Sequence, residues 1–168
     1  GVNYGEHRQE TGMEPTRPAF NMIFNKAESA ICGAFDEIIR PEHVQLLDYE
    51  IELGLVIGQP INATTVITTE NLHEFIAGVV ITNDISARDV QISQLQWMKG
   101  KSYRTFCPVG PYLTVLTAQE FEALDNLQLT LKVNGEIRQQ AFVSQMLYRP
   151  LETIQELVTV MDFKPGDL

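Results

Sequence analysis

Three carboxylates in this sequence stand where they could act together on a metal ion or a substrate. Glu50 and Glu52 are two positions apart in the run LDYEIELGLVIG, and side chains at this spacing on a strand share one face. Two carboxylates on one face cannot both be buried without a compensating positive charge. Asp84 follows the apolar segment 79–82, a place from which a carboxylate commonly points into a cleft. The alternative is a solvent-exposed face that these glutamates merely hydrate.

The chemistry of this set favours a hard cation. Glu50, Glu52 and Asp84 have no His or Cys near them in sequence, so the ligands would all be oxygen atoms. Carboxylate oxygens suit Mg²⁺, Mn²⁺ or Ca²⁺ and suit structural zinc poorly.

Hydrogen-bond donors follow Asp84 closely, in the run RDVQISQLQWMKGK. In an acidic protein such donors could hold an anionic substrate beside a metal ion, whereas the alternative is a solvated loop with scattered charges. The donors in this run are Arg88, Gln91, Gln96, Lys99 and Lys101.

Composition limits the classes of protein that need to be considered. The 168 residues are 44% hydrophobic and 20% charged, as in one ordinary globular domain. The net charge of -10 works against binding nucleic acid or an anionic membrane. No apolar run reaches the length of about 20 residues that a membrane span needs. The two cysteines form neither a disulfide framework nor a metal pair, so we expect a cytoplasmic protein.

Apolar periodicity and turn residues predict an α+β fold in which β-structure predominates. No internal repeat or linker divides the chain, so we expect one domain. Residues 1–20 carry no sustained period and form a candidate lid, with one helical turn at 6–11. The other expected elements are β-like runs between 35 and 58, a helix from about 71, a strand at 79–82, a hairpin on Asn134-Gly135, and a helix over 151–161.

Both ends of the sequence lack the usual boundary features. The chain opens on GVNYGEH without Met, and it stops just after Pro165-Gly166, a turn that normally leads into another element. We therefore expect the domain to be incomplete at both ends.

Five ordered motifs resemble the successive signatures of the fumarylacetoacetate hydrolase family. They span nearly the whole chain and are NYGEHRQETG, LDYEIELGLVIG, GVVITNDISARDVQ, QWMKGKSYRTFCPVGP and VNGEIRQ. The resemblance implies a single catalytic domain over 1–168 with a mixed β-sheet roll or sandwich and a few short helices. It also implies a homodimer, for which the apolar hairpin and helix of 127–161 could supply a surface.

The resemblance also implies roles for individual residues. The family's E-x-E and distant Asp make Glu50, Glu52 and Asp84 the ligands of Mg²⁺ or Mn²⁺, with Ca²⁺ as a further candidate. His7 and Glu10 match an H-x-x-E pair that activates water from a lid, although an exposed loop histidine is the alternative for His7. The residues on substrate-binding positions are Arg88, Gln91 and Lys101, and Lys101 would also act in catalysis.

The implied activity is metal-dependent cleavage of a C–C bond in 2,4-diketo acids such as acylpyruvates. His7 would take a proton from water while Lys101 and Gln91 stabilise the oxyanion. The same site chemistry serves decarboxylation of oxaloacetate, tautomerisation, or isomerisation and hydration of unsaturated 2-oxo dioic acids. A non-catalytic alternative is a protein that binds 2-oxo acids through the metal.

Overall fold

In the computed structural model, which describes residues 2–168, short helices and short strands alternate along the chain. The helices are α1 (Gly5–Glu10), α2 (Leu72–Phe75), α3 (Arg88–Gln94), α4 (Trp97–Lys101), α5 (Ala118–Glu122) and α6 (Pro150–Leu157). The strands are β1 (Ile31–Gly33), β2 (Leu47–Asp48), β3 (Ile51–Ile57), β4 (Ile76–Asn83), β5 (Ser86–Ala87), β6 (Cys107–Val109), β7 (Gln128–Val133) and β8 (Glu136–Phe142). Short 3₁₀ turns lie at Glu28–Ala30, Leu124–Asn126 and Val143–Gln145.

A mixed four-stranded sheet forms the centre of the fold, in the order β1-β6-β4-β3. Strands β1 and β6 are parallel, whereas β4 runs antiparallel to both β6 and β3. The β3–β4 ladder extends from the pair Ile51–Asn83 to the pair Ile57–Ile76, with one irregularity after Val56. This arrangement confirms the expected α+β fold with a mixed sheet.

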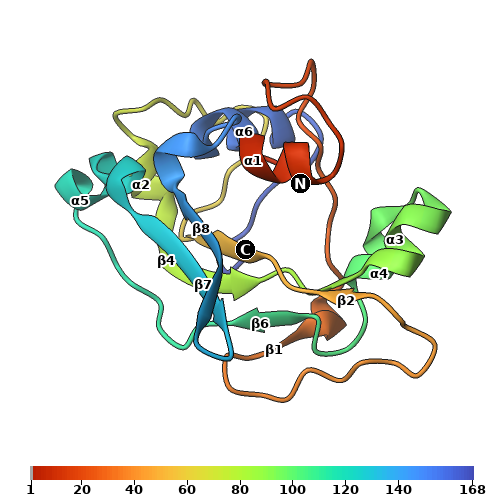
Figure 1. The fold of residues 1–168 in the computed structure, drawn as a ribbon. Helices are drawn as coiled ribbons and strands as arrows, with labels where there is room; N and C mark the ends of the chain where they lie inside the picture. Colours follow the sequence, from red (N-terminus) through yellow and green to blue (C-terminus); the bar gives the residue numbers. More distant parts are fainter. Residues whose placement is uncertain (1) are drawn as a thin grey trace.

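The β7–β8 hairpin crosses one side of this sheet (Figure 1). Its turn residues Asn134 and Gly135 have φ values of 52° and 85°, as a two-residue hairpin turn with matching twist requires. The Gln139 side chain ties the hairpin to the beginning of β3, because its amide accepts from Ile51 N at 2.9 Å and donates to Tyr49 O at 3.3 Å. The hairpin therefore has a fixed position beside Glu50.

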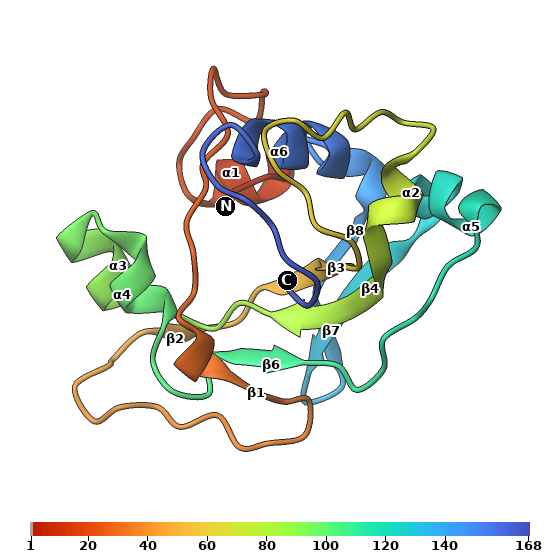
Figure 2. The same cartoon turned by 180° about the vertical axis from the view of Figure 1, so that it is seen from behind.

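Helices α1 and α6 lie together on one side of the molecule in both views (Figures 1 and 2). Pro150 begins α6 at a position where a missing backbone N–H does no harm. Ile154 of this helix packs with Ile57, Ile61 and Leu72 in one of two buried apolar clusters. The helix expected over 151–161 is thus confirmed, although it ends at Leu157.

Helices α3 and α4 occupy the donor-rich run for which a solvated loop was the alternative. Gly100 permits their close contact, because a Cβ there would lie 2.7 Å from the backbone N of Gln91. The second apolar cluster, which includes Ile85, Val90 and Phe106, lies beneath these helices. Their packing places Lys101 in the interior.

One expectation about the sheet was wrong. Residues 34–46 form no strand, although β-like runs were expected from residue 35. Local contacts hold this segment as a loop: Gly33 N–H donates to Asp36 at 2.7 Å, and Val44 N–H donates to Pro41 O at 3.0 Å. Within residues 2–168, none of the helices has the length and apolar character needed to cross a membrane.

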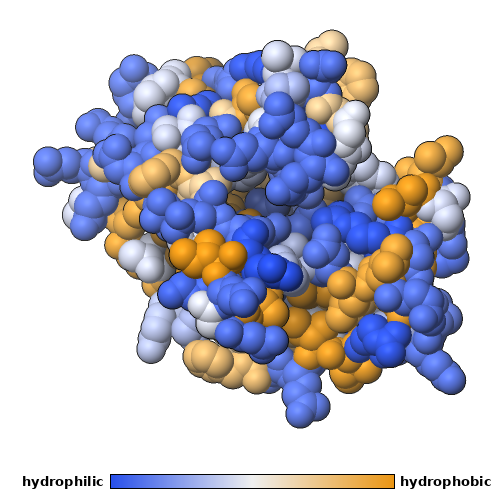
Figure 3. All heavy atoms as spheres, in the orientation of Figure 1, coloured by the Kyte–Doolittle hydropathy of each residue, from blue (hydrophilic) through white to orange (hydrophobic). Residues whose placement is uncertain are grey.

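Apolar side chains gather on the lower part of the face shown in Figure 3, beside the hairpin and the 34–46 loop. Exposed apolar residues of the hairpin and of the segment after α6 include Ile137, at 55% exposure, and Val160, at 79%. The homodimer stays a prediction.

Candidate active site

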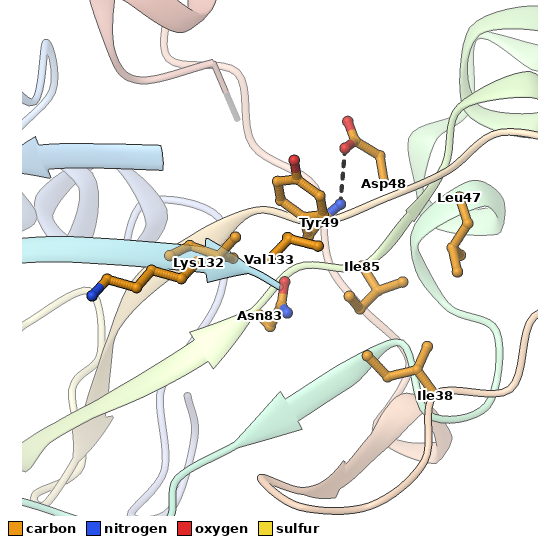
Figure 4. A pocket seen from close by; sticks show the side chains of 9 residues that line it. Ile38, Leu47, Asp48, Tyr49, Asn83, Ile85, Lys132 and Val133 are labelled. Atoms are coloured by element: carbon orange, nitrogen blue, oxygen red, sulfur yellow. Dashed lines mark hydrogen bonds between the residues drawn. The ribbon is translucent and has the colours of Figure 1, made fainter. Parts of the chain in front are cut away.

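Two surface hollows differ in their chemical content. The larger, about 300 Å³, is lined mainly by apolar side chains such as Ile38, Leu47 and Ile85. In Figure 4 these three gather on one side, while the amino end of Lys132 points away from them. This hollow contains none of the expected site residues.

The smaller hollow, about 140 Å³, contains the chemistry that the sequence predicts. It lies between α1, the beginning of β3 and strand β8. Its polar and charged lining residues are Asn3, Tyr4, Glu6, His7, Glu10, Glu50, Glu52, Arg138, Gln139 and Gln140.

Backbone contacts at the junction of β3 and β4 bring Glu50 beside Asp84. The Asp84 N–H donates to Glu50 O at 2.8 Å, and the Glu50 N–H donates to Oδ1 of Asn83 at 3.1 Å. Two residues that are 34 positions apart are thus neighbours at the end of one ladder.

Lysine ammonium groups supply the positive charge that these carboxylates require. Lys101 Nζ contacts Glu50 and donates to Oδ2 of Asp84 at 2.6 Å, and its side chain is only 1% exposed. Lys26 Nζ contacts the other oxygen of Asp84 and donates to Ile85 O at 3.2 Å. Lys101 therefore lies behind Glu50 and does not line the hollow.

Arg88 adds a third cation to the cluster. Its guanidinium lies 2.7 Å from Oε1 of Glu50 and 2.7 Å from Oδ2 of Asp48. Gln91, which is buried, accepts from Arg88 Nη1 at 2.9 Å. In this structure Arg88 contacts both Gln91 and Glu50, and neither Arg88 nor Gln91 lines the hollow.

His7 reaches into the hollow from α1 and lies between two carboxylates. Its Nε2 is 3.2 Å from Oε1 of Glu50, and its Nδ1 is 3.6 Å from Oε2 of Glu10. The contact with Glu50 raises the pKa of His7 above its usual value. Burial alone would raise the pKa of Glu50, but His7, Lys101 and Arg88 outweigh it, so that this pKa is lowered.

The segment that carries His7 is attached to the start of α6 and the chain before it. Asn3 O accepts from Leu147 N–H at 2.8 Å, and Asn3 Oδ1 accepts from Tyr148 N–H at 2.7 Å. Farther along, Tyr148 Oη donates to Pro18 O at 2.8 Å, and Arg17 pairs with Glu152 at 2.8 Å. These contacts hold the candidate lid over the hollow at both of its ends.

Glu52 also lines the hollow, and within residues 2–168 it forms no ion pair with a Lys, Arg or His side chain. Burial, together with the charges of Glu50 and Asp84, raises the pKa of Glu52 to about 7. The buried Tyr4 hydroxyl has no hydrogen-bond partner within residues 2–168. The raised pKa of Glu52 and the unpaired buried hydroxyl of Tyr4 mark a place where a cation or a polar ligand would be stabilising.

The donor set fits a divalent cation in chemistry, though the carboxylates are not gathered around one point. Across residues 2–168, no group of three or more His, Cys, Asp or Glu side chains stands in an arrangement that could hold a metal ion. Lys101 lies between Glu50 and Asp84. Binding through Glu50, Glu52 and Asp84 stays a prediction, supported by their oxygen-only chemistry and by the raised pKa of Glu52.

Two residues near the site were not among the predicted site residues. Lys26 contacts Asp84 across 58 residues, and Tyr4 lies in the hollow. The motif NYGEHRQETG contains Tyr4, whereas Lys26 lies in a loop, where no helical or strand period marks a residue.

The fold and the pocket together define a class of protein. A mixed α+β domain holds a histidine above a buried cluster of carboxylates and ammonium groups, an arrangement typical of enzymes that move protons. The whole of residues 1–168 matches the family model described as fumarylacetoacetate (FAA) hydrolase C-terminal. The chain therefore belongs to the fumarylacetoacetate hydrolase family.

Similar proteins cover the whole chain. An uncharacterized protein of Methanocaldococcus jannaschii is 36% identical over 168 residues, which are 100% of this chain and 67% of that protein. The mitochondrial oxaloacetate tautomerase Fahd2a of Rattus norvegicus is 36% identical, with 100% of this chain and 52% of that protein covered. The chain thus spans about half the length of that relative.

Solved structures share the fold as well. The crystal structure of 2-hydroxyhepta-2,4-diene-1,7-dioate isomerase from Mycobacterium marinum has a TM-score of 0.81 at 34% identity. The match covers 90% of this chain and 57% of that one. Two of these relatives, the Rattus norvegicus and Mycobacterium marinum proteins, are named for tautomerisation and isomerisation of acids, which agrees with the alternative activities considered above more closely than with C–C bond hydrolysis.

Proposed function

We propose that this chain is the catalytic domain of a metal-dependent tautomerase or isomerase acting on enolisable 2-oxo acids. The observation that carries the proposal is the placement of His7, whose Nε2 lies 3.2 Å from Glu50 in a hollow backed by Lys101 and Arg88. Relatives named for oxaloacetate tautomerase and for a dioate isomerase support the substrate class.

In this proposal Glu50, Glu52 and Asp84 would hold Mg²⁺ or Mn²⁺. When bound, the cation would supply Lewis-acid polarisation of the substrate carbonyl. Lys101 and Lys26 hold Glu50 and Asp84 in place and offset part of the cost of burying them, because buried carboxylates need a positive partner.

Enol-to-keto conversion moves one proton and changes no oxidation state. The hydroxyl proton of the enol leaves, and a proton is added to the carbon of the C=C bond that does not bear the oxygen. The C=C bond becomes single while the C–O bond becomes double. His7 has a carboxylate at each ring nitrogen, Glu10 at 3.6 Å and Glu50 at 3.2 Å. The imidazole can therefore accept a proton at one nitrogen and release one from the other, which is the role of a general acid and base.

Cleavage of acylpyruvates is the second candidate, and the His7–Glu10 pair favours it specifically. Hydrolysis requires a base that deprotonates water, and Glu10 lies where it can orient the imidazole for that task. A decarboxylase would have no need of this pair, since loss of CO₂ requires only an acceptor for the electrons.

Enol oxaloacetate provides a direct test. Ultraviolet absorbance follows its conversion to the keto form in Mg²⁺ buffer, with and without the protein. We expect the protein to accelerate the conversion, and Glu50→Gln to abolish the acceleration. Glu74→Gln, an exposed position on α2, is the matched control and should retain it. The proposal is rejected if neither Mg²⁺ nor Mn²⁺ supports acceleration of oxaloacetate tautomerisation or of the isomerisation of an unsaturated 2-oxo dioic acid.

A further inference from the structure

Strand β8 contains a bulge at Arg138. Leu131 of β7 pairs with Gln139, and the next residue, Lys132, pairs with Ile137. Arg138 is therefore the extra residue of β8 and faces no residue on β7. Bulges of this kind redirect a side chain and are frequent beside active sites.

The position of this bulge is fixed relative to the site. Gln139, the next residue, bonds Ile51 N at 2.9 Å and Tyr49 O at 3.3 Å, on either side of Glu50. Arg138 lines the hollow of about 140 Å³ together with His7 and Glu50. Arg138 thus belongs to the part of the wall that β8 forms.

Unlike the other basic residues of the site, Arg138 is free of buried carboxylate partners in the part of the chain that the structure describes and can therefore bind a ligand. Lys101, Lys26 and Arg88 each contact buried carboxylates and stand behind the hollow. Within residues 2–168, Arg138 is the one Arg or Lys among the lining residues. Its ion pair with Glu136 is 3.7 Å long, and the two side chains are 52% and 77% exposed. Such an exposed pair contributes little and can be exchanged for a better partner.

We propose that Arg138 binds the carboxylate at the far end of the substrate, so that the site prefers 2-oxo dicarboxylic acids to 2-oxo acids with a neutral tail. This inference rests on the proposed function, since it assumes that the 2-oxo end lies at Glu50 and Glu52. A planar guanidinium can pair both oxygens of a carboxylate, which gives geometric specificity as well as attraction. Glu6 and Glu10, which also line the hollow, would repel an unpaired carboxylate, and this increases the need for Arg138.

Calorimetry with two acids of equal chain length tests the inference. The probes are 2-oxoglutarate and 2-oxopentanoate, titrated into the whole chain in Mg²⁺ buffer, so that only the distal carboxylate differs. We expect 2-oxoglutarate to bind about tenfold more tightly or better, the lower range for a charged hydrogen bond. In Arg138→Gln the two affinities should agree within about twofold. Arg138→Lys should retain part of the preference, because lysine keeps the positive charge but cannot pair both carboxylate oxygens as a planar guanidinium does.

Lys132→Gln is the matched control. It removes one positive charge from the same hairpin, next to the bulge, but Lys132 lines the larger hollow. The control should keep the wild-type preference. The inference is overturned if the wild type shows no preference or binds neither acid, if Arg138→Gln retains the preference, or if Lys132→Gln loses it equally.

The two proposals can fail separately. Binding requires no turnover, so a preference that depends on Arg138 supports the inference even if enol oxaloacetate is not converted. Conversely, if oxaloacetate is converted but the Arg138→Gln variant keeps the wild-type preference, the proposed function stands and the assignment of Arg138 is wrong.

Discussion

Lys101 Nζ lies 2.6 Å from Oδ2 of Asp84, and the same ammonium contacts Glu50. One side chain, almost fully buried, therefore joins the end of β4 to the beginning of β3. The charge of Lys101 stabilises the site as a structure, in addition to any role that it has toward a substrate.

Lys101→Met should destabilise the protein strongly. Removing the ammonium leaves two carboxylates close together and buried, and breaking a buried ion pair in this way costs about 3 kcal/mol or more. Urea unfolding measures the loss. Lys99→Met is the control, because Lys99 is exposed on the same helix and its substitution should change stability by no more than about 0.5 kcal/mol. Equal losses in both variants would show that the buried contacts of Lys101 are not important for stability.

The positions of these carboxylates could be predicted because local pattern determines them. Glu50 and Glu52 share a face of a strand by period two, and Asp84 follows an apolar β-branched run. The hairpin turn was equally predictable, since Asn134-Gly135 adopts the positive φ values that such a turn needs. The sequence also led to the expectation that a positive charge must accompany the glutamates.

Periodicity could not predict which basic side chains supply the positive charge beside these carboxylates. Lys26 contacts Asp84 from a loop 58 residues earlier in the sequence. No pattern in the residues around Lys26 indicates this long-range contact. Helices α3 and α4 are short and carry mixed polar residues, so their sequence resembles that of a solvated loop. Only the tertiary structure shows that Gly100 packs against Gln91. The bulge at Arg138 depends on the pairing of two strands, which the alternation within one strand does not reveal.

Removal of one predicted ligand should weaken metal binding. Calorimetric titration of Mn²⁺ or Mg²⁺ into metal-stripped protein should give a dissociation constant that rises at least about tenfold in Glu52→Gln. Glu6→Gln removes the same charge from the lining of the same hollow, and we expect it to have a much smaller effect. If the two variants behave alike, the effect is one of general charge and Glu52 is not a ligand.

The attachment of the candidate lid should depend on pH through Glu152. The hydrogen bond from Arg149 N and the pairing with Arg17 lower the pKa of Glu152. A lowered pKa contributes stability above the unfolded value, near 4.5, and this contribution is lost as the pH falls through the folded value. The carboxyl is largely exposed, so that solvent screens the effect.

We therefore expect Glu152→Gln to lower the thermal midpoint at pH 7, and we expect this difference to shrink as the pH falls through the folded pKa and the wild-type carboxyl becomes protonated too. Glu156→Gln, an exposed position on the same helix, serves as the control at each pH. A difference between wild type and Glu152→Gln that persists unchanged in acid would contradict this account.

Ligand binding should reduce the mobility of the segment 1–20. Its attachment rests on contacts such as Arg17–Glu152 and Tyr148–Pro18, and several of its residues, Glu10 among them, are exposed. Segments without a core of their own open locally at small energetic cost. Hydrogen exchange in this segment should slow when Mg²⁺ and oxalate are added together. Unchanged exchange there, with binding confirmed by calorimetry, would argue against a lid.

Substitution of His7 should separate the three candidate reactions. A positioned general acid or base contributes on the order of 10² to 10⁴ in rate, so His7→Ala should lower enol-to-keto conversion by about that factor. Hydrolysis of an acylpyruvate should fall comparably, because it needs a proton removed from water. Decarboxylation of oxaloacetate should change only a few-fold, since it requires no base.

Glu10→Ala should cause a smaller loss than His7→Ala, because Glu10 lies 3.6 Å from the imidazole and orients it without taking the substrate proton. Wild-type rates on the three substrates then decide which activity predominates, with oxalate affinity as the check that the pocket is intact. Tautomerisation that survives in His7→Ala within a few-fold of wild type would remove His7 from the proton transfer, and faster wild-type cleavage of acylpyruvate than tautomerisation would make the chain a hydrolase.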